Sequence, residues 1–274
     1  MAKYQAPSGI SWNYDDKGQG DVLVFLHGWG VDRRIWRQQI KYFSEHYRVL
    51  SVDLPGHGES SWKAIPMESM GLDFKAWLDD LKIDSMTLIG SSLGGMFSLQ
   101  IYALMPDKIK SLVMVGSMPK FAKSEDYPYG LDISQIRKLN AQVNSDYPSI
   151  INVFFRSLFT REERATRRFR WLQRFRRDVV NPQAKPLCDY LNILEQEDFR
   201  DVLKQVTAPV QFINGTHDTI CTKKTVDFLR QLCPRARFDF FDKCGHFPFL
   251  SQPYAFNSLL QDFLSRHDKE GMEK

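Results

Sequence analysis

Short and nearly continuous apolar runs recur along the chain, and longer segments with helical periodicity lie between them. Such runs, bounded by turn residues, are typical of strands buried on both faces of a parallel sheet. The runs that predict strands are Val22–Leu26, Val49–Val52, Met86–Ile89, Leu112–Val115, Val210–Ile213 and Phe238–Phe241. The segments that predict helices are Arg33–Ser44, Met67–Leu81, Leu93–Met105, Lys223–Leu232 and Tyr254–Leu264. The alternation predicts an α/β fold with a mostly parallel central sheet and helices on both faces.

This alternation stops over residues 117–206, where the pattern predicts mostly helix. The prolines that we expect to break these helices are Pro128, Pro148, Pro182 and Pro186. We therefore predict a core of residues 1–116 and 207–274 and a helical lid of residues 117–206. Open α/β sheets bind ligands beyond the carboxyl ends of their strands, so we expect the lid to cover that edge.

Composition narrows the class of protein. The 274 residues are 43% hydrophobic and 26% charged, which is typical of a globular α/β protein and excludes a disordered chain. No window approaches the roughly 18 apolar residues of a membrane span, and the N-terminus lacks the apolar core of a signal peptide, so we expect a cytoplasmic protein. The cysteines show no C-x-x-C spacing and are expected to be reduced, without disulfide or metal roles. They are Cys188, Cys221, Cys233 and Cys244.

A candidate nucleophile lies between a predicted strand and a predicted helix, in Gly90-Ser91-Ser92-Leu93-Gly94. This is the context of a G-x-S-x-G elbow, in which a strained turn lifts the serine hydroxyl clear of the sheet. The two glycines allow strand and helix to approach closely. The motif predicts Ser92 as nucleophile, because Ser91 lacks glycines at the right offsets.

A serine hydroxyl needs a neighbouring base at neutral pH, and in this fold the chain order is serine, acid, histidine. His246 follows the last predicted strand, and Asp218 follows the strand before it. A carboxylate in that place accepts the second imidazole proton and fixes the tautomer. Asp242 is the competing acid, but it lies on the same segment as the base, and we favour Asp218.

Two backbone N–H groups are needed to bind the oxyanion of an acyl-transfer reaction. The expected donors are Leu93, directly after the nucleophile, and Trp29, in the loop after an early strand. A second glycine-containing loop, Asp53–Ser60, is predicted to be structural, with Asp53 bonded to nearby amides. The residues predicted to contact substrate are Trp29, Leu93, Tyr147, Ile151 and Ile220.

In order and spacing, these motifs resemble the α/β-hydrolase superfamily over essentially the whole chain. Within it, the sequence is similar to the pimeloyl-[acyl-carrier protein] methyl ester esterases of biotin synthesis. The points of similarity are Leu26-His-Gly-Trp-Gly, Val52-Asp-Leu-Pro-Gly, Ser92-Leu-Gly-Gly, Gly116-Ser-Met-Pro-Lys-Phe, Glu125-Asp-Tyr-Pro and Cys244-Gly-His-Phe-Pro-Phe. The resemblance implies a cytoplasmic monomer without cofactor or metal that cleaves the methyl ester of a pimeloyl chain carried on acyl-carrier protein. The family usually has Trp before the nucleophile, where this chain has Ser91, and the change bears on the shape of the acyl pocket.

Basic residues are concentrated in the predicted lid, where residues 151–180 contain nine Arg, no Lys and three acids. Forked guanidinium donors suit carboxylates and phosphates, and an acyl-carrier protein is acidic and carries a phosphopantetheine arm. A basic rim would speed its encounter and orient the acyl chain. The residues predicted to bind this partner are Arg156, Arg167, Arg168, Arg170 and Arg174, and the remaining arginines are Arg161, Arg164, Arg176 and Arg177.

Other interpretations of this segment are a solvated helix face or, less favoured, a nucleic-acid site. The interleaved Phe169, Trp171 and Phe175 are expected to form the inward face of the lid rather than a base-stacking platform. We expect no nucleic acid and no membrane as partners, and small esters as further substrates.

Two kinds of alternative function remain open at the level of sequence. A general carboxylesterase, a thioesterase or a carbon–carbon bond hydrolase of the same fold would carry the same triad. A ligand-binding receptor or scaffold with little turnover belongs to another class, and the complete triad and oxyanion loop favour an enzyme over it.

Overall fold

A central sheet of eight strands organises the molecule in the computed structural model, which describes residues 1–147, 149–177 and 183–270, with 175–177 and 267–270 described in their backbone alone. The strands are β1 (Ala2–Gln5), β2 (Ser11–Lys17), β3 (Val22–Leu26), β4 (Arg48–Val52), β5 (Met86–Ser91), β6 (Ile109–Val115), β7 (Val210–Gly215) and β8 (Arg237–Phe241). Their order across the sheet is β1-β2-β4-β3-β5-β6-β7-β8. Strands β3 to β8 pair in parallel, and β1 and β2 extend one edge in antiparallel fashion.

All six predicted strands are present, and the mostly parallel sheet is confirmed. The two antiparallel strands β1 and β2 were missed. Side chains of β1 alternate between half-buried and exposed, and β2 ends in the exposed Asp16 and Lys17. Edge strands need not be apolar on both faces, so they lack the continuous runs that identified the other six.

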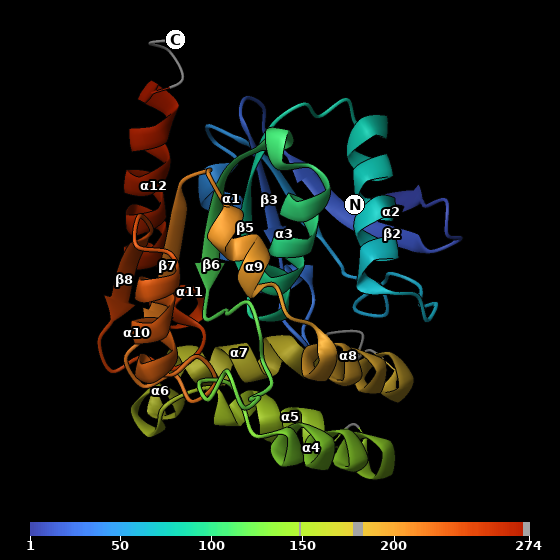
Figure 1. The fold of residues 1–274 in the computed structure, drawn as a ribbon, viewed down its shortest axis with the longest axis vertical. Coiled ribbons are helices and arrows are strands. Elements are labelled where there is room, and N and C mark those ends of the chain that lie inside the picture. The colour runs from blue at the N-terminus through green and yellow to red at the C-terminus, as the bar shows by residue number, and fades with distance from the viewer. Residues whose placement is uncertain (148, 178–182, 271–274) are drawn as a thin grey trace.

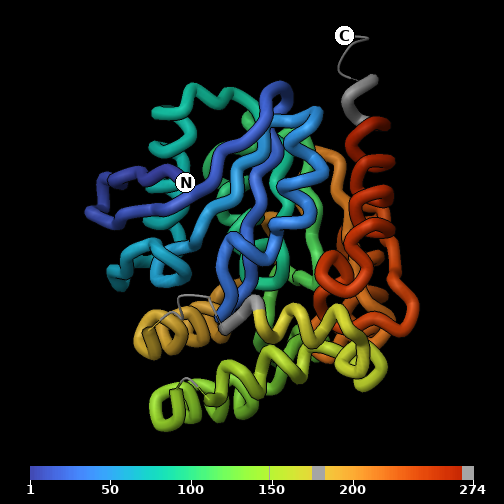
Figure 2. Tube along the Cα trace, turned by 180° about the vertical axis from the view of Figure 1, so that it is seen from behind, coloured from blue at the N-terminus to red at the C-terminus, as the bar shows by residue number. Residues whose placement is uncertain are grey.

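Helices cover both faces of the sheet (Figures 1 and 2). Between the helices and the sheet, each face has its own hydrophobic cluster. They are α1 (Arg37–Phe43), α2 (Met67–Asp80), α3 (Leu93–Leu104), α10 (Lys223–Leu232), α11 (Pro248–Ser251) and α12 (Pro253–Glu270), with short 3-10 turns η1 (Arg33–Trp36) and η2 (Pro106–Lys108). Trp77 of α2 and Met96 of α3 belong to one cluster, and Phe43 of α1 and Leu260 of α12 belong to the other. The apolar strands are therefore buried from both sides.

Five helices of the insertion lie together beyond the carboxyl ends of the parallel strands (Figures 1 and 2). They are α4 (Ile133–Asp146), α5 (Ser149–Ser157), α6 (Arg161–Ala165), α7 (Arg167–Arg177) and α8 (Ala184–Gln196). The sixth, α9 (Arg200–Gln205), packs instead against α3 and α10 of the core. We therefore interpret α4–α8 as the lid and count α9 with the core, although it falls within the lid range predicted from the sequence.

Of the prolines expected to break helices, Pro128 lies in a turn outside any helix. Pro186 was wrongly predicted to be a break, because it lies in the first turn of α8. Proline is tolerated there, since N–H groups of the first turn have no partner within the helix. Pro148 and Pro182 lie outside the described residues.

The four cysteines are free and buried, as expected. Among the helices in the described ranges, none is long and apolar enough to cross a membrane.

Candidate active site

Ser92 occupies a sharp turn between β5 and α3. Its backbone has φ 53° and ψ −117°, a conformation that a residue with a side chain seldom adopts. The turn is held by hydrogen bonds, since the Ser92 N–H donates to the Val115 carbonyl of β6 at 2.9 Å and the Ser117 hydroxyl donates to the Ser92 carbonyl at 2.7 Å. Ser92 is partly exposed while Ser91 and Leu93 are buried. The strain thus presents one hydroxyl at the carboxyl edge of the sheet.

His246 and Asp218 are joined by a hydrogen bond of 2.8 Å between Nδ1 and Oδ2, and both side chains are buried. The other carboxylate oxygen, Oδ1, accepts the N–H groups of Ile220 at 2.8 Å and Cys221 at 3.1 Å. A carboxylate held in this way assigns the proton to Nδ1 and leaves Nε2 as an acceptor. The alternative acid, Asp242, is exposed and accepts a hydrogen bond from the Thr216 hydroxyl instead.

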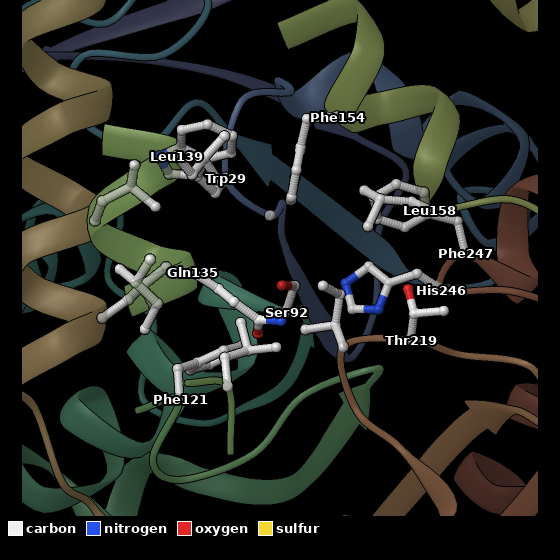
Figure 3. A pocket seen from close by; sticks show the side chains of 16 residues that line it. Trp29, Ser92, Phe121, Gln135, Leu139, Phe154, Leu158, Thr219, His246 and Phe247 are labelled. Carbon is white, nitrogen blue, oxygen red and sulfur yellow. The ribbon is translucent and has the colours of Figure 1, made fainter. Parts of the chain in front are cut away.

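Ser92 and His246 face a common cavity of about 310 Å³ beneath the lid (Figure 3). The walls are mostly apolar, with Phe247 from the core, Phe121 from the segment between β6 and α4, and Phe154 and Leu158 from the lid. The polar exceptions beside the serine and histidine include Gln135 and Thr219. The arrangement suits an extended apolar group whose reactive end reaches Ser92.

The predicted substrate contacts are brought to this cavity in part. Trp29 and Ile220 line it, but Leu93, Tyr147 and Ile151 do not. Leu93 is fully buried, so its main chain rather than its side chain adjoins the site. Ile151 is buried against the Trp29 loop, where an added Cβ on Gly30 would lie 3.8 Å from its side chain.

Phe154 of α5 and Leu158, directly after that helix, line the cavity, although Ile151 lies on the same side of the helix, within about 60° of each. Tyr147, at the end of α4, packs against the hydrophobic core instead. The sequence predicted that this segment is helical but not which of its apolar side chains face the cavity.

Ser91 is the last residue of β5 and is fully buried. Among the described residues its hydroxyl has no hydrogen-bond partner, and Ser91 is not among the residues that line the cavity.

Leu93 follows Ser92 directly in the chain, and the loop that contains Trp29 approaches Ser92 closely. Leu93 begins α3, so its N–H has no acceptor within the helix. In the Trp29 loop, an added Cβ on Gly28 would lie 3.2 Å from the Ser92 Cβ, which shows how closely the loop approaches the nucleophile. The Trp29 indole donates to the Leu187 carbonyl of the lid at 2.9 Å and forms part of the cavity wall.

Two buried histidines hold this loop, a role that the sequence analysis did not assign. His27 Nδ1–H donates to the Gly28 carbonyl at 2.8 Å, and its Nε2 accepts the Leu54 N–H at 3.0 Å. His57 Nε2 accepts the Gly30 N–H at 3.2 Å. Burial lowers the pKa of His27 to about 4 and the pKa of His57 well below its ordinary value, so both rings are neutral at pH 7 and keep an acceptor nitrogen.

The second glycine-containing loop is structural, as predicted. Asp53 accepts the N–H groups of Arg33 at 2.8 Å and Glu59 at 3.0 Å, and it forms a buried ion pair with the Arg33 guanidinium. Within the described residues, no group of three or more His, Cys, Asp or Glu side chains is arranged to hold a metal ion.

The lid arginines differ in where their side chains lie. Arg156, Arg167, Arg170 and Arg174 are exposed, as a docking surface requires. Arg168 is half-buried, and its Nε donates to the Leu250 carbonyl of the core. Its guanidinium joins the lid to α11, so Arg168 is less available to a partner than the four exposed arginines, and its role in partner binding stays a prediction.

The side chains of Phe175, Arg176 and Arg177 lie outside the described residues. Phe169 is buried, as expected for the inward face of the lid, and Trp171 is partly buried. The Arg156 guanidinium lies 5.8 Å from the centre of the Phe169 ring.

An eight-stranded, mostly parallel sheet, a strained serine elbow and a buried His–Asp pair define the class of protein as an α/β hydrolase. The sequence pattern of the family described as alpha/beta hydrolase fold matches residues 21–253. The chain belongs to this family, and the predicted fold class is confirmed.

Relatives lie close in sequence over nearly the whole chain. The pimeloyl-[acyl-carrier protein] methyl ester esterase of Nitrosomonas europaea is 32% identical over 248 residues, which cover 90% of this chain and 97% of that protein. The enzyme of the same name from Legionella pneumophila is 29% identical, covering 91% and 98%. The resemblance expected from the motifs is confirmed.

Solved structures agree on the fold. An esterase from Exiguobacterium antarcticum superposes with a TM-score of 0.87 at 24% identity, covering 96% of this chain and 98% of that one. The enol-lactonase from Burkholderia xenovorans superposes with a TM-score of 0.85 at 21% identity, covering 96% of this chain and 100% of that one. At this identity the likeness concerns architecture rather than substrate.

Proposed function

We propose that this protein is a serine carboxylesterase that hydrolyses the methyl ester of a pimeloyl chain carried on acyl-carrier protein, a step of biotin synthesis. The observation that carries the proposal is the shared cavity of Ser92 and His246, with Asp218 bonded behind the imidazole. The name borne by the relatives from Nitrosomonas and Legionella supplies the substrate.

In the proposed reaction, Nε2 of His246 takes the proton of Ser92 as the hydroxyl attacks the ester carbonyl. The N–H groups of Trp29 and Leu93 bind the oxyanion. His246 then protonates the leaving methanol, and an acyl-enzyme remains. Water, deprotonated by the same imidazole, releases the free carboxylate.

The apolar cavity supports an aliphatic acyl chain as the group next to the ester. Its size lies at the lower end of the range of about 300 to 1,000 Å³ found for small-ligand sites. The exposed arginines of the lid support an acidic carrier protein as partner, with Arg156, Arg167, Arg170 and Arg174 as the proposed contacts. A cytoplasmic monomer without cofactor completes the proposal.

The test is to incubate purified protein with pimeloyl-[acyl-carrier protein] methyl ester and follow the carrier by mass spectrometry. We expect loss of the methyl group with the thioester intact, and no reaction with Ser92→Ala. A fluorophosphonate probe should label the wild-type serine and not the variant.

Other outcomes would contradict the proposal in separate ways. Release of the acyl group from the carrier identifies a thioesterase, and turnover of small esters alone identifies a general carboxylesterase. Absence of both labelling and turnover favours a receptor or scaffold that retains the fold.

A further inference from the structure

The loop that carries His246 is bonded to the lid through three consecutive residues. The His246 N–H donates to the Leu158 carbonyl at 2.8 Å. The Gly245 N–H donates to Oε2 of Glu163 at 3.1 Å, and the Cys244 thiol donates to Oε1 of the same carboxylate at 3.2 Å. Leu158 and Glu163 flank the start of α6, so one short stretch of lid receives three donors in a row.

The other side of this loop is bonded to the segment that carries the acid. The Cys244 carbonyl accepts the His217 N–H at 2.9 Å, next to Asp218. The peptide leading into His246 is therefore held between the lid and the Asp218 segment. The imidazole has few ways to move while both sets of bonds are in place.

Glu163 also closes a capping box at the start of α6, since its Oε2 accepts the Thr160 N–H at 2.6 Å and the Thr160 hydroxyl accepts the Glu163 N–H at 3.1 Å. In an ordinary capping box the acidic side chain accepts a hydrogen bond only from the backbone N–H at the start of its own helix. Here the same oxygen accepts a second N–H, from Gly245, some eighty residues further along the chain. The cap thereby fixes the carboxylate in the place where the histidine loop needs an acceptor.

Close approach explains why position 245 is glycine. An added Cβ would collide with the Leu158 carbonyl oxygen and would lie 3.1 Å from Oε2 of Glu163. Burial and the Glu163 carboxylate raise the pKa of the Cys244 thiol, so the thiol keeps its proton and remains a donor. Each of the three groups on the loop side thus has a hydrogen to donate, and Glu163 supplies two of the three acceptor oxygens.

We propose that Glu163 is a positioning residue for the reaction: it holds residues 244–246 so that the His246 imidazole stays aligned between Asp218 and Ser92. The proposal rests on the esterase function proposed above. It makes the lid part of the catalytic apparatus as well as a cover, because a lid residue sets the geometry of the base. Small displacements of a base are costly, and about 1 Å is enough for a loss of about 100-fold in rate.

The test compares variants on a small soluble ester, which needs no carrier protein. In Glu163→Ala, we expect kcat per fluorophosphonate-reactive serine to fall about 10- to 100-fold, with KM changed by less than about twofold. In Glu163→Gln, the amide oxygen can still accept from Thr160 and Gly245, so most of kcat should be retained. A spectroscopic measurement runs beside the kinetics: the low-field proton resonance of His246 Nδ1–H should broaden in Glu163→Ala and persist in Glu163→Gln.

Two matched controls separate positioning from helix stability and from charge. Thr160→Ala removes the other half of the capping box but leaves the Glu163 bonds to the histidine loop. It should lower Tm by less than Glu163→Ala, which also loses the bonds to Gly245 and Cys244, and it should keep kcat. Glu162→Ala removes an equal charge from the exposed neighbouring residue and should change neither quantity.

Three results would overturn the proposal. They are a wild-type kcat per reactive serine in Glu163→Ala, an equal loss of kcat in Thr160→Ala, or no rescue by Glu163→Gln. Failure of the esterase proposal itself would be distinct, because the wild-type protein would then neither react with the fluorophosphonate nor turn over the ester.

Discussion

The two carboxylate oxygens of Asp218 have different partners, and this decides which imidazole nitrogen is protonated. Oδ1 accepts two backbone N–H groups, from Ile220 and Cys221, and Oδ2 faces His246. The backbone donors orient the carboxylate before any substrate binds. The Asp218 carboxylate, oriented by its own loop, thus favours the tautomer of His246 in which Nδ1 carries the proton.

Asp218→Asn should lower kcat by about four orders of magnitude, with little change in the fold. The amide oxygen would stay with the two backbone donors, so the amide NH₂ would face Nδ1 of His246. That nitrogen would then have to accept, and Nε2 would carry the proton and could not deprotonate Ser92. Steady-state kinetics with a small ester measure the loss, and circular dichroism checks the fold.

The matched control for that variant is Asp242→Asn. Asp242 is exposed and is not bonded to the imidazole, so its kcat should stay within about twofold of the wild type. Equal loss in the two variants would contradict the assignment of Asp218 as the acid.

At the scale of the element, the apolar face of α5 serves two purposes. Ile151 and Phe155 are buried in the hydrophobic clusters, while Phe154 and, directly after the helix, Leu158 line the cavity. The Phe154 ring also meets the Trp29 ring edge-on, with centroids 5.0 Å apart. One helix therefore attaches the lid to the core and forms a wall of the cavity.

Phe154→Ala should impair esters of long acyl chains more than esters of short ones. Loss of this aromatic wall removes contact worth about 1 to 3 kcal/mol from the acyl chain, so kcat/KM for a heptanoyl ester should fall about 10-fold or more relative to an acetyl ester. Activities on a series of p-nitrophenyl esters measure the ratio.

Val153→Ala serves as the control on the same helix, because Val153 is 61% exposed and lies outside the cavity lining. Its ratio of long- to short-chain activity should match the wild type. An unchanged ratio in Phe154→Ala would show that the acyl chain does not lie along α5.

For the molecule as a whole, positive charge is concentrated on the lid, which covers a mostly apolar cavity. Exposed charges act through long-range attraction and contribute to the rate of encounter more than to folding stability. Arg168 is an exception among the lid arginines, since its guanidinium is bonded to Leu250. A test of docking should therefore leave Arg168 in place.

The triple variant Arg167→Glu, Arg170→Glu and Arg174→Glu should raise KM for the carrier-bound methyl ester at least about 10-fold. It should leave kcat and KM for a small soluble ester nearly unchanged, because these side chains do not line the cavity. Added salt should raise the KM of the wild-type enzyme for the carrier-bound ester. It should therefore reduce the difference in KM between the wild type and the triple variant. Equal loss on both substrates, or a wild-type KM that is insensitive to salt, would contradict carrier docking at this face.

Local pattern was sufficient for much of the fold. The apolar runs predicted six of the eight strands, and the order of the motifs predicted the serine elbow, the family and the residues proposed as base and acid. These features depend on contacts within a few residues: an apolar run makes a strand buried on both faces, and glycines at fixed offsets permit a strained turn. The sequence alone therefore determined which loops are proposed to carry the chemistry.

Tertiary structure decided which way side chains on those elements face. A hydrogen bond to His246 identifies Asp218 rather than Asp242 as its partner. Phe154 lies in the cavity wall and Ile151 does not, and the Arg168 guanidinium is bonded to the core. Successive residues of a helix point about 100° apart, so a small rotation of the helix exchanges cavity, core and solvent positions. That rotation is set by packing against residues far away in the chain, as is the contact of Glu163 with the histidine loop.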